Sequence, residues 1–290
     1  RLLIPQILKS IDDDIEHTVF SYIPNTAESA FFGLTEGLDA TCAETRVKKI
    51  MAEKEHLTEE RLHEILHYRP RIEKVAIKDV KMRTFITQDD ERDDLVTHVY
   101  DITYGTVHPG QDNLVVIDDS IVRGTTLRRS IIRILDRLKP KKIIICSSAP
   151  QIRYPDCYGI DMSRLGDFVA FKAAIALLKE RGMNHVIDDV YHRAKIQMGL
   201  ERSEVVNCVK KIYEPFTDQE ISDKVAQIVT TPDINAKVEV IYQSVENLHR
   251  AIPVHNGDWY FTGNYPTPGG NVVANKAFIN FYENRNERAY

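Results

Sequence analysis

Apolar positions along this chain recur in two patterns: short continuous runs, typical of buried strands, and runs with a period near 3.6, typical of helices. The short runs predict strands over residues 18–23, 75–80, 114–117, 142–146 and 238–242. The helical period predicts helices over 2–11, 30–38, 44–68, 127–138 and 245–251, and mostly helical structure through 171–235. Strands that alternate with helices across short links predict an α/β fold with a parallel, doubly wound sheet.

The chain shows no internal repeat and no clear interdomain linker, so we interpret it as one domain over residues 1–290. The core is expected at about 18–170 and 238–252, a helical insertion at about 171–235, and a C-terminal tail at 253–290. In the helix that follows residue 126, apolar side chains recur on one side and four arginines lie largely on the other. That helix is therefore expected to bury its apolar side against the sheet.

Composition narrows the class of protein. With 43% hydrophobic and 28% charged residues among 290, we expect a soluble globular protein. A formal net charge of −5 argues against general nucleic-acid binding, and no apolar run approaches the roughly 20 residues of a membrane helix.

The four cysteines form no Cys-x-x-Cys pair and suit a reducing cytoplasm as inert core thiols. Because the sequence begins at Arg1, without an initiator Met or a signal peptide, we expect an excised or processed chain.

The segment that carries chemistry is VVIDDSIVRGTT, residues 115–126. A buried strand delivers Asp118 and Asp119 at its carboxyl end, where open α/β sheets bind ligands. The short loop that follows contains Gly124 and leads into a helix start, whose free N–H groups favour a phosphate. Two carboxylates suited to sugar hydroxyls or hydrated Mg²⁺ beside a phosphate cradle match a phosphorylated ribose. The alternative is a capped helix after a solvated acidic strand end; the segment is neither a Walker A loop nor a dinucleotide fingerprint.

These residues resemble a known motif. Residues 115–126 are similar to the 5-phosphoribosyl-1-pyrophosphate (PRPP) motif of type I phosphoribosyltransferases. Together with APQIRYPDCYGIDM at 149–162, they resemble more narrowly the glutamine PRPP amidotransferases, or amidophosphoribosyltransferases. RTFI at 83–86 is similar to that family's flexible loop, and FTGNYP at 261–266 to a C-terminal segment. The resemblance implies a type I phosphoribosyltransferase-like fold and a Mg²⁺ cofactor.

The resemblance also implies roles for individual residues. Asp118 and Asp119 would hold the ribose hydroxyls and Mg²⁺, and Thr26 would be a further metal ligand in a loop that faces the pyrophosphate. The catalytic side chains, on a lid that closes over PRPP, would be Lys78, Lys81 and Arg83. The implied PRPP-binding set is Asn25, Thr26, Asp118, Asp119, Ser120, Ile121, Val122, Arg123, Gly124, Thr125 and Thr126.

In this family, ammonia attacks C1 of PRPP with inversion and pyrophosphate leaves, giving 5-phosphoribosylamine in the first committed step of purine nucleotide synthesis. The resemblance implies glutamine as the ammonia source in the full-length enzyme, purine nucleotide inhibitors, a homo-oligomer, and a cytoplasmic location without nucleic-acid or membrane partners. This chain departs from the family in lacking the N-terminal glutaminase domain, so we expect no glutaminase activity. Ala27 stands where many members place a Mg²⁺-binding Ser. No iron–sulfur cluster is expected, because Cys157 is offset and Gly257 and Tyr260 replace a Cys-x-x-Cys pair.

Two alternatives stay open. A PRPP- or nucleotide-binding regulatory module without turnover is motivated by Ala27 and by residues 40–74 and roughly 171–218, which look longer than in the family. A zinc hydrolase is suggested by His63-Glu64-Ile65-Leu66-His67, which matches the H-E-x-x-H pattern. The surrounding helix is highly charged and Pro70 ends it, so we expect these histidines on a helix flank rather than on zinc.

Overall fold

The computed structural model describes residues 1–290 apart from 25, 79–99, 160–161, 255–256 and 290, and at Lys78 and Tyr100 it describes the backbone alone. The chain forms two compact units. The sheet unit comprises Arg1–Asp119, Thr126–Ser148 and Thr230–Ile241, and the helical unit comprises Ser120–Thr125, Ala149–Val229 and Tyr242–Tyr290. The interpretation of the chain as one domain stays a prediction.

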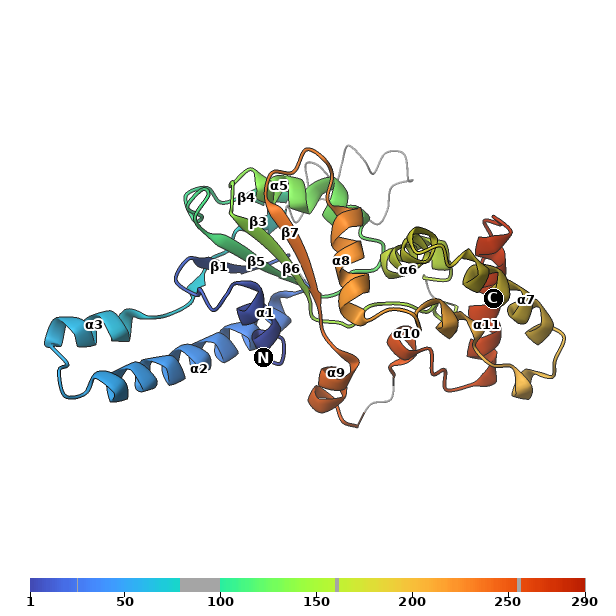
Figure 1. Ribbon diagram of the computed structural model, residues 1–290, viewed down its shortest axis with the longest axis horizontal. Coiled ribbons are helices and arrows are strands. Elements are labelled where there is room, and N and C mark those ends of the chain that lie inside the picture. The colour runs from blue at the N-terminus through green and yellow to red at the C-terminus, as the bar shows by residue number, and fades with distance from the viewer. Residues whose placement is uncertain (25, 79–99, 160–161, 255–256, 290) are drawn as a thin grey trace. The chain divides into compact units, whose positions relative to one another are not determined.

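A five-stranded sheet is the centre of the sheet unit (Figure 1). Its strand order is β2-β1-β5-β6-β7. Its strands are β1 (Thr18–Tyr22), β2 (Arg71–Ile72), β5 (Asn113–Asp118), β6 (Lys142–Ser147) and β7 (Lys237–Tyr242). β1 pairs in parallel with β2 and β5, and β5 pairs in parallel with β6. β1, β5 and β6 are buried along almost their whole length, as continuous apolar runs require. The parallel α/β fold is therefore confirmed.

Helices bury their apolar sides against this sheet. One apolar core joins α1 (Ile4–Ser10), the first half of α2 (Glu28–Glu53) and strands β1, β5 and β6. The helix that follows Thr126 consists of a π-helical turn, η1 (Leu127–Ile131), and α5 (Ile132–Asp136). Its apolar side chains are buried and its four arginines are exposed, which confirms the amphipathic pattern expected from the sequence.

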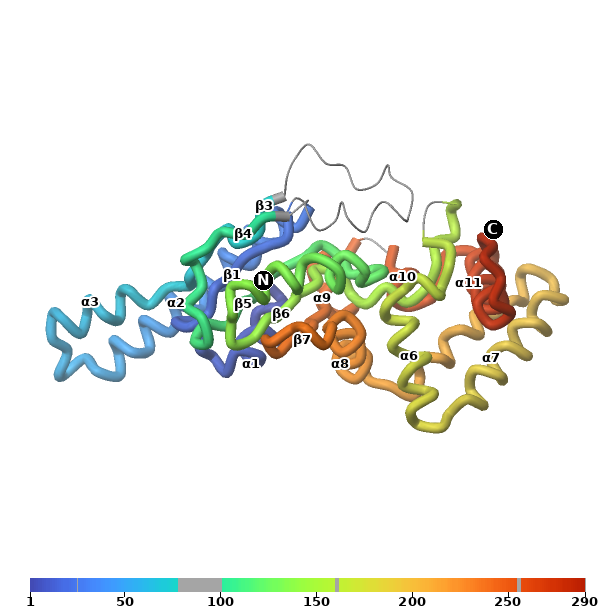
Figure 2. Tube along the Cα trace, turned by 90° about the horizontal axis from the view of Figure 1, so that it is seen from above, coloured from blue at the N-terminus to red at the C-terminus, as the bar shows by residue number. Residues whose placement is uncertain are grey.

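Beyond Cys42, its last buried residue, α2 continues away from the sheet, and α3 (Glu59–His67) runs back along it (Figures 1 and 2). The Thr58 hydroxyl accepts the N–H of Arg61 at 3.2 Å and so caps the start of α3. A smaller antiparallel pair is formed by β3 (Ala76–Lys78) and β4 (Tyr100–Ile102).

The helical unit has helices α6 (Val169–Glu180), α7 (Asn184–Gln197), α8 (Asp218–Val229), α9 (Val245–Ala251), α10 (Trp259–Thr262) and α11 (Pro268–Tyr282). Short 3₁₀ turns join them at η2 (Leu165–Asp167), η3 (Arg202–Glu204) and η4 (Cys208–Ile212). Aromatic contacts hold α6 to α11, where the ring of Phe171 meets Phe281 edge-on at 4.8 Å. The mostly helical character expected for 171–235 is confirmed.

Several predicted boundaries are wrong. The break between the helices expected at 30–38 and 44–68 lies later in the chain than predicted. Helix α2 is continuous to Glu53, and α3 begins after the Thr58 cap. Small residues in the middle of α2 obscured its apolar period.

β2 and β4 were not expected, because two- and three-residue strands carry too few positions to show a period. The expected tail contains the 15-residue helix α11. The strand predicted at 75–80 is present as β3, and residues 79–80 lie outside the described residues.

Cys42, Cys146 and Cys208 are buried free thiols, as expected, whereas Cys157 is half-buried. Burial raises the pKa of these thiols, which keeps them in the protonated, unreactive form. Within the residues that the structure describes, no helix combines the length and apolar character needed to cross a bilayer.

Candidate functional site at the carboxyl ends of the strands

Parallel pairing brings the ends of β1, β5 and β6 to one edge of the sheet. The N–H of Ile23 donates to the carbonyl of Ile117 at 2.9 Å, and the N–H of Ser148 donates to the carbonyl of Asp118 at 2.9 Å. In register, Asp118 faces Ser147 of β6. The residues of β5 before Asp118 are all buried, and Asp118, the last residue of the strand, is partly exposed at this edge.

The two carboxylates that the sequence singled out lie together here. The N–H of Asp119 donates to the Asp118 carboxylate at 2.9 Å, and the Ser148 hydroxyl donates to the Asp119 carbonyl at 2.9 Å. Burial, reinforced by the neighbouring Asp119 carboxyl, raises the pKa of Asp118 to about 8. At neutral pH the free chain therefore holds Asp118 mainly protonated, and a cation placed between the two carboxyls would ionise it. Ser148 was missed in the sequence; its signal was its position at the end of the next apolar run.

The segment that follows leaves the sheet unit, since Ser120–Thr125 belong to the helical unit and Thr126 returns to the sheet unit. Gly124 has φ of +69°, and a Cβ there would lie 3.1–3.3 Å from side-chain atoms of Val169 and Val229. The left-handed backbone conformation favours glycine here, and a Cβ would also press tightly on both valines. The N–H of Val169 donates to the carbonyl of Val122 at 2.8 Å, which fixes the middle of the segment.

The remaining residues of this segment differ in exposure. Ile121 is buried, which fits an anchoring role better than ligand contact. Ser120, Val122 and Arg123 are partly exposed, and an Arg123 guanidinium nitrogen lies 3.8 Å from the Asp167 carboxylate. Thr125 and Thr126 are exposed, and the Thr126 side chain makes no capping hydrogen bond to η1. Both hydroxyls are therefore accessible to a ligand.

The structure describes only some of the other residues that were assigned roles by resemblance. Thr26 is exposed, and Ala27 beside it is fully buried at the start of α2. Asn25, Lys81 and Arg83 lie outside the described residues, as does the side chain of Lys78, whose backbone pairs with Tyr100 in the β3–β4 ribbon. Their predicted roles at the pyrophosphate stay predictions.

The donor set at this edge suits Mg²⁺. Mg²⁺ takes hard oxygen ligands and usually binds through one or two carboxylates plus waters and substrate phosphates. Asp118 and Asp119 supply two such carboxyls, and burial, reinforced by the Asp119 carboxyl, raises the pKa of Asp118. Over the described part of the chain, no three or more His, Cys, Asp and Glu side chains gather closely enough to hold a metal ion by themselves. Two carboxyls alone would leave the other coordination positions of a metal ion to waters or to ligand oxygens.

The H-E-x-x-H segment lies on α3, and its side chains have other partners. His67 Nδ1 lies 2.7 Å from the carbonyl of His63, and the Glu64 carboxylate pairs with Arg61 at 2.9 Å. The two imidazole rings are 6.3 Å apart, centre to centre. On this helix Ile65 is buried and Leu66 is exposed.

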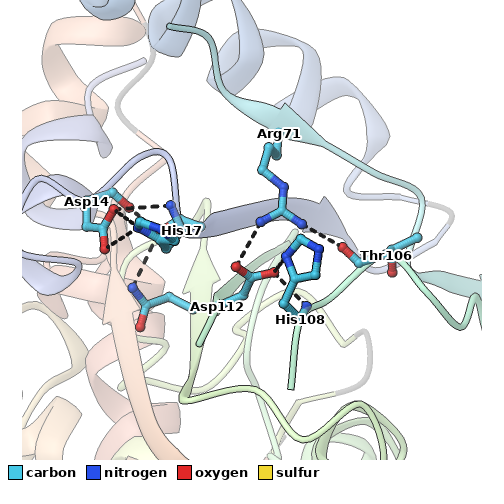
Figure 3. Close-up of polar contacts among 8 residues, drawn as sticks. Asp14, His17, Arg71, Thr106, His108 and Asp112 are labelled. Carbon is cyan, nitrogen blue, oxygen red and sulfur yellow. Dashed lines mark hydrogen bonds and ion pairs between the residues drawn. The ribbon is translucent and has the colours of Figure 1, made fainter. Parts of the chain in front are cut away.

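A second polar cluster lies at the opposite, amino-terminal edge of the sheet (Figure 3). Asp112, fully buried just before β5, holds the Arg71 guanidinium at 2.8 Å and accepts the backbone N–H of His108 at 2.7 Å. Nearby, the carboxylate of Asp14 contacts the ring of His17 at 2.9 Å. These contacts tie β2 to the turn before β5. The charged groups here have a structural role, and they lie at the end of the strands opposite Asp118.

Comparison with known proteins gives short matches to one family. No protein-family model matches the chain. It is 46% identical to the amidophosphoribosyltransferase of Pasteurella multocida over 59 residues, which are 20% of this chain and 12% of that enzyme. It is 45% identical to those of Escherichia coli and Pseudomonas aeruginosa over 58 residues, 20% of this chain and 11% of each enzyme. This chain is a distant, partial match to the amidophosphoribosyltransferases.

Two solved structures align with more of the chain, but with a low TM-score. One is described as the allosteric regulatory enzyme of purine biosynthesis, and another as glutamine PRPP amidotransferase from B. subtilis complexed with ADP and GMP. Each aligns with 86% of this chain at 21% identity and a TM-score of 0.44, over 37% and 38% of its own length.

Proposed function

We propose that this chain is the phosphoribosyltransferase part of an amidophosphoribosyltransferase-like enzyme, which converts PRPP and ammonia to 5-phosphoribosylamine and pyrophosphate with Mg²⁺. The Asp118–Asp119 pair at the carboxyl end of β5 is the observation that carries the proposal. The segment that follows it, with the glycine at 124 and the exposed hydroxyls of Thr125 and Thr126, supports the proposal as a phosphate cradle. The partial similarity to amidophosphoribosyltransferases supports the same reading.

In the proposed reaction, the nitrogen of ammonia bonds to C1 of the ribose while the bond from C1 to the pyrophosphate oxygen breaks. The electron pair of the broken bond leaves with the pyrophosphate, and the surplus proton on nitrogen passes to solvent. Bound Mg²⁺ would neutralise charge that develops on the leaving pyrophosphate. Asp118 and Asp119 would hold this metal and the ribose hydroxyls, while Thr125 and Thr126 would orient the 5-phosphate.

Calorimetric titration of PRPP into the chain, with and without Mg²⁺, tests binding first. The proposal expects metal-dependent binding near one PRPP per chain. Pyrophosphate release in saturating ammonia then tests turnover, and Asp119→Asn should lower it by about 100-fold or more. Asp12→Asn is the matched control, because Asp12 is an exposed carboxyl whose φ of +54° suits asparagine. Unchanged pyrophosphate release by Asp119→Asn would refute the assignment.

A second candidate is a PRPP-binding module without turnover. Ala27 favours it, because this fully buried side chain has no atom that can bind metal where many amidophosphoribosyltransferases place a serine. Metal-dependent PRPP binding with no pyrophosphate release in saturating ammonia is the result expected of such a module.

A further inference from the structure

The part of α2 beyond Cys42 and the whole of α3 form a two-helix projection, residues 43–67, which we call the α2–α3 hairpin. It extends away from the sheet of its own unit in both views (Figures 1 and 2). It lies within the segment 40–74, for which the proposed PRPP site has no use. Between residue 43 and the end of α2, no side chain is fully buried, so this half of the helix lacks a core to pack against.

Contacts within the hairpin fix which side of each helix faces the other. Arg61 binds the Glu53 carboxylate through two nitrogens at 2.8 and 2.9 Å. Arg46 donates to the carbonyl of Tyr68 at 2.9 Å, and Ile65 of α3 is only 2% exposed. The hairpin is therefore an ordered element, and these residues mark its inner seam.

The two broad sides of the hairpin, one on either side of that seam, differ in polarity. A rotation of about 100° per residue places two apolar side chains of each helix on the same side. We call this side the apolar face; it comprises Val47, Ile50, Leu62 and Leu66. The opposite side carries Thr45, Ala52, Glu60 and Glu64. Val47 is 60% exposed and Leu66 is 50% exposed, and Met51 beside the apolar face is 62% exposed.

Charge is also divided between the two helices. Residues 44–54 carry four basic and two acidic side chains, whereas residues 55–67 carry four acidic and one basic. The same rotation places Lys54, at the end of α2, and Glu59, at the start of α3, at the rim of the apolar face near the turn. The hairpin thus presents a basic helix and an acidic helix around one apolar face.

We propose that the apolar face docks on the apolar face of a second copy of this chain, with α2 of each copy against α3 of the other. A two-fold axis along the hairpin produces this pairing, which sets the basic helix against the acidic one and Lys54 against the partner's Glu59. A two-fold axis across the hairpin would instead set α2 against α2, bringing like charges together. Charge complementarity therefore selects a four-helix arrangement of two hairpins pointing the same way.

Analytical ultracentrifugation of the full chain tests the surface. We expect a concentration-dependent dimer, with the dissociation constant raised about tenfold or more by Leu66→Ala and further by Leu66→Glu. Ala52→Glu is the matched control, because it adds the same charge on the opposite, exposed side and should leave the dissociation constant unchanged. Circular dichroism checks that each variant keeps its helices. A wild-type chain that stays monomeric at tens of micromolar, or a dimer unaffected by Leu66→Glu, overturns the proposal.

A charge exchange tests the pairing itself. Lys54→Glu and Glu59→Lys should each weaken self-association, because each sets like charges across the two-fold axis. When the two variants are mixed, both cross-axis contacts become Glu with Lys, so a mixed dimer should form more tightly than either variant alone. A contact between residues 54 and 59 of the same copy would not be restored by mixing. Failure of the mixture to associate therefore overturns the proposed orientation even if the wild type dimerises.

Discussion

The raised pKa of Asp118 predicts how the stability of the free chain depends on pH. A carboxyl whose pKa rises from 3.8 to about 8 on folding binds its proton more tightly in the native state. Its contribution to stability is therefore lost progressively as the pH rises from about 4 to about 8. Asp118→Asn removes the titrating group but keeps its shape and its ability to accept a hydrogen bond from the Asp119 N–H.

The size of the effect follows from the same shift. Each pKa unit is worth about 1.4 kcal/mol, so the full difference sets an upper limit of about 6 kcal/mol. Asp118 is only partly enclosed, and solvent reduces the penalty for its charge, so we expect about 2–4 kcal/mol. Asp118→Asn should therefore equal the wild type in stability near pH 4 and exceed it by that amount at pH 8.

Urea unfolding of the two proteins in the absence of Mg²⁺, at intervals from pH 4 to pH 8, measures this difference. Asp233→Asn is the control, because the nearby Thr231 side chain, the Asp233 backbone N–H and the Arg133 guanidinium lower the pKa of Asp233. Its removal should destabilise the chain, the opposite sign from Asp118→Asn. A stability difference between Asp118→Asn and the wild type that does not grow with pH would refute the reasoning.

Three further changes have defined outcomes. Gly124→Ala forces a Cβ into a left-handed backbone and against two valines, so thermal unfolding should show a loss of about 1–3 kcal/mol together with loss of PRPP binding. Arg71→Met leaves the buried Asp112 carboxylate without its guanidinium and should cost about 2–3 kcal/mol in urea unfolding, whereas Arg71→Lys should recover part of the loss. Thr126→Ala should change stability by less than about 0.5 kcal/mol, since that hydroxyl caps nothing, while weakening PRPP binding about tenfold in calorimetry.

Much of the sheet unit could be predicted from local sequence. The runs that became β1, β5 and β6 are apolar throughout because both of their faces are covered, so composition alone identifies them. The helix after Thr126 could be predicted equally well, since its apolar and arginine positions follow one helical period. Asp118 and Asp119 could be placed at a strand end for the same reason. These features depend on residues close together in the chain.

What only the tertiary structure decided depends on residues far apart. The place of Ser148 beside the carboxylate pair comes from the parallel pairing of β5 with β6, which no local pattern encodes. The burial that raises the pKa of Asp118 requires the packed sheet around it. The course of α2 was decided by the loss of core contacts beyond Cys42 and by the return of α3 along it. The sequence by itself determined which segments are buried and where the acidic pair sits, because burial and chain order are local; register, burial of charge and the seam of the hairpin arose only when distant segments met.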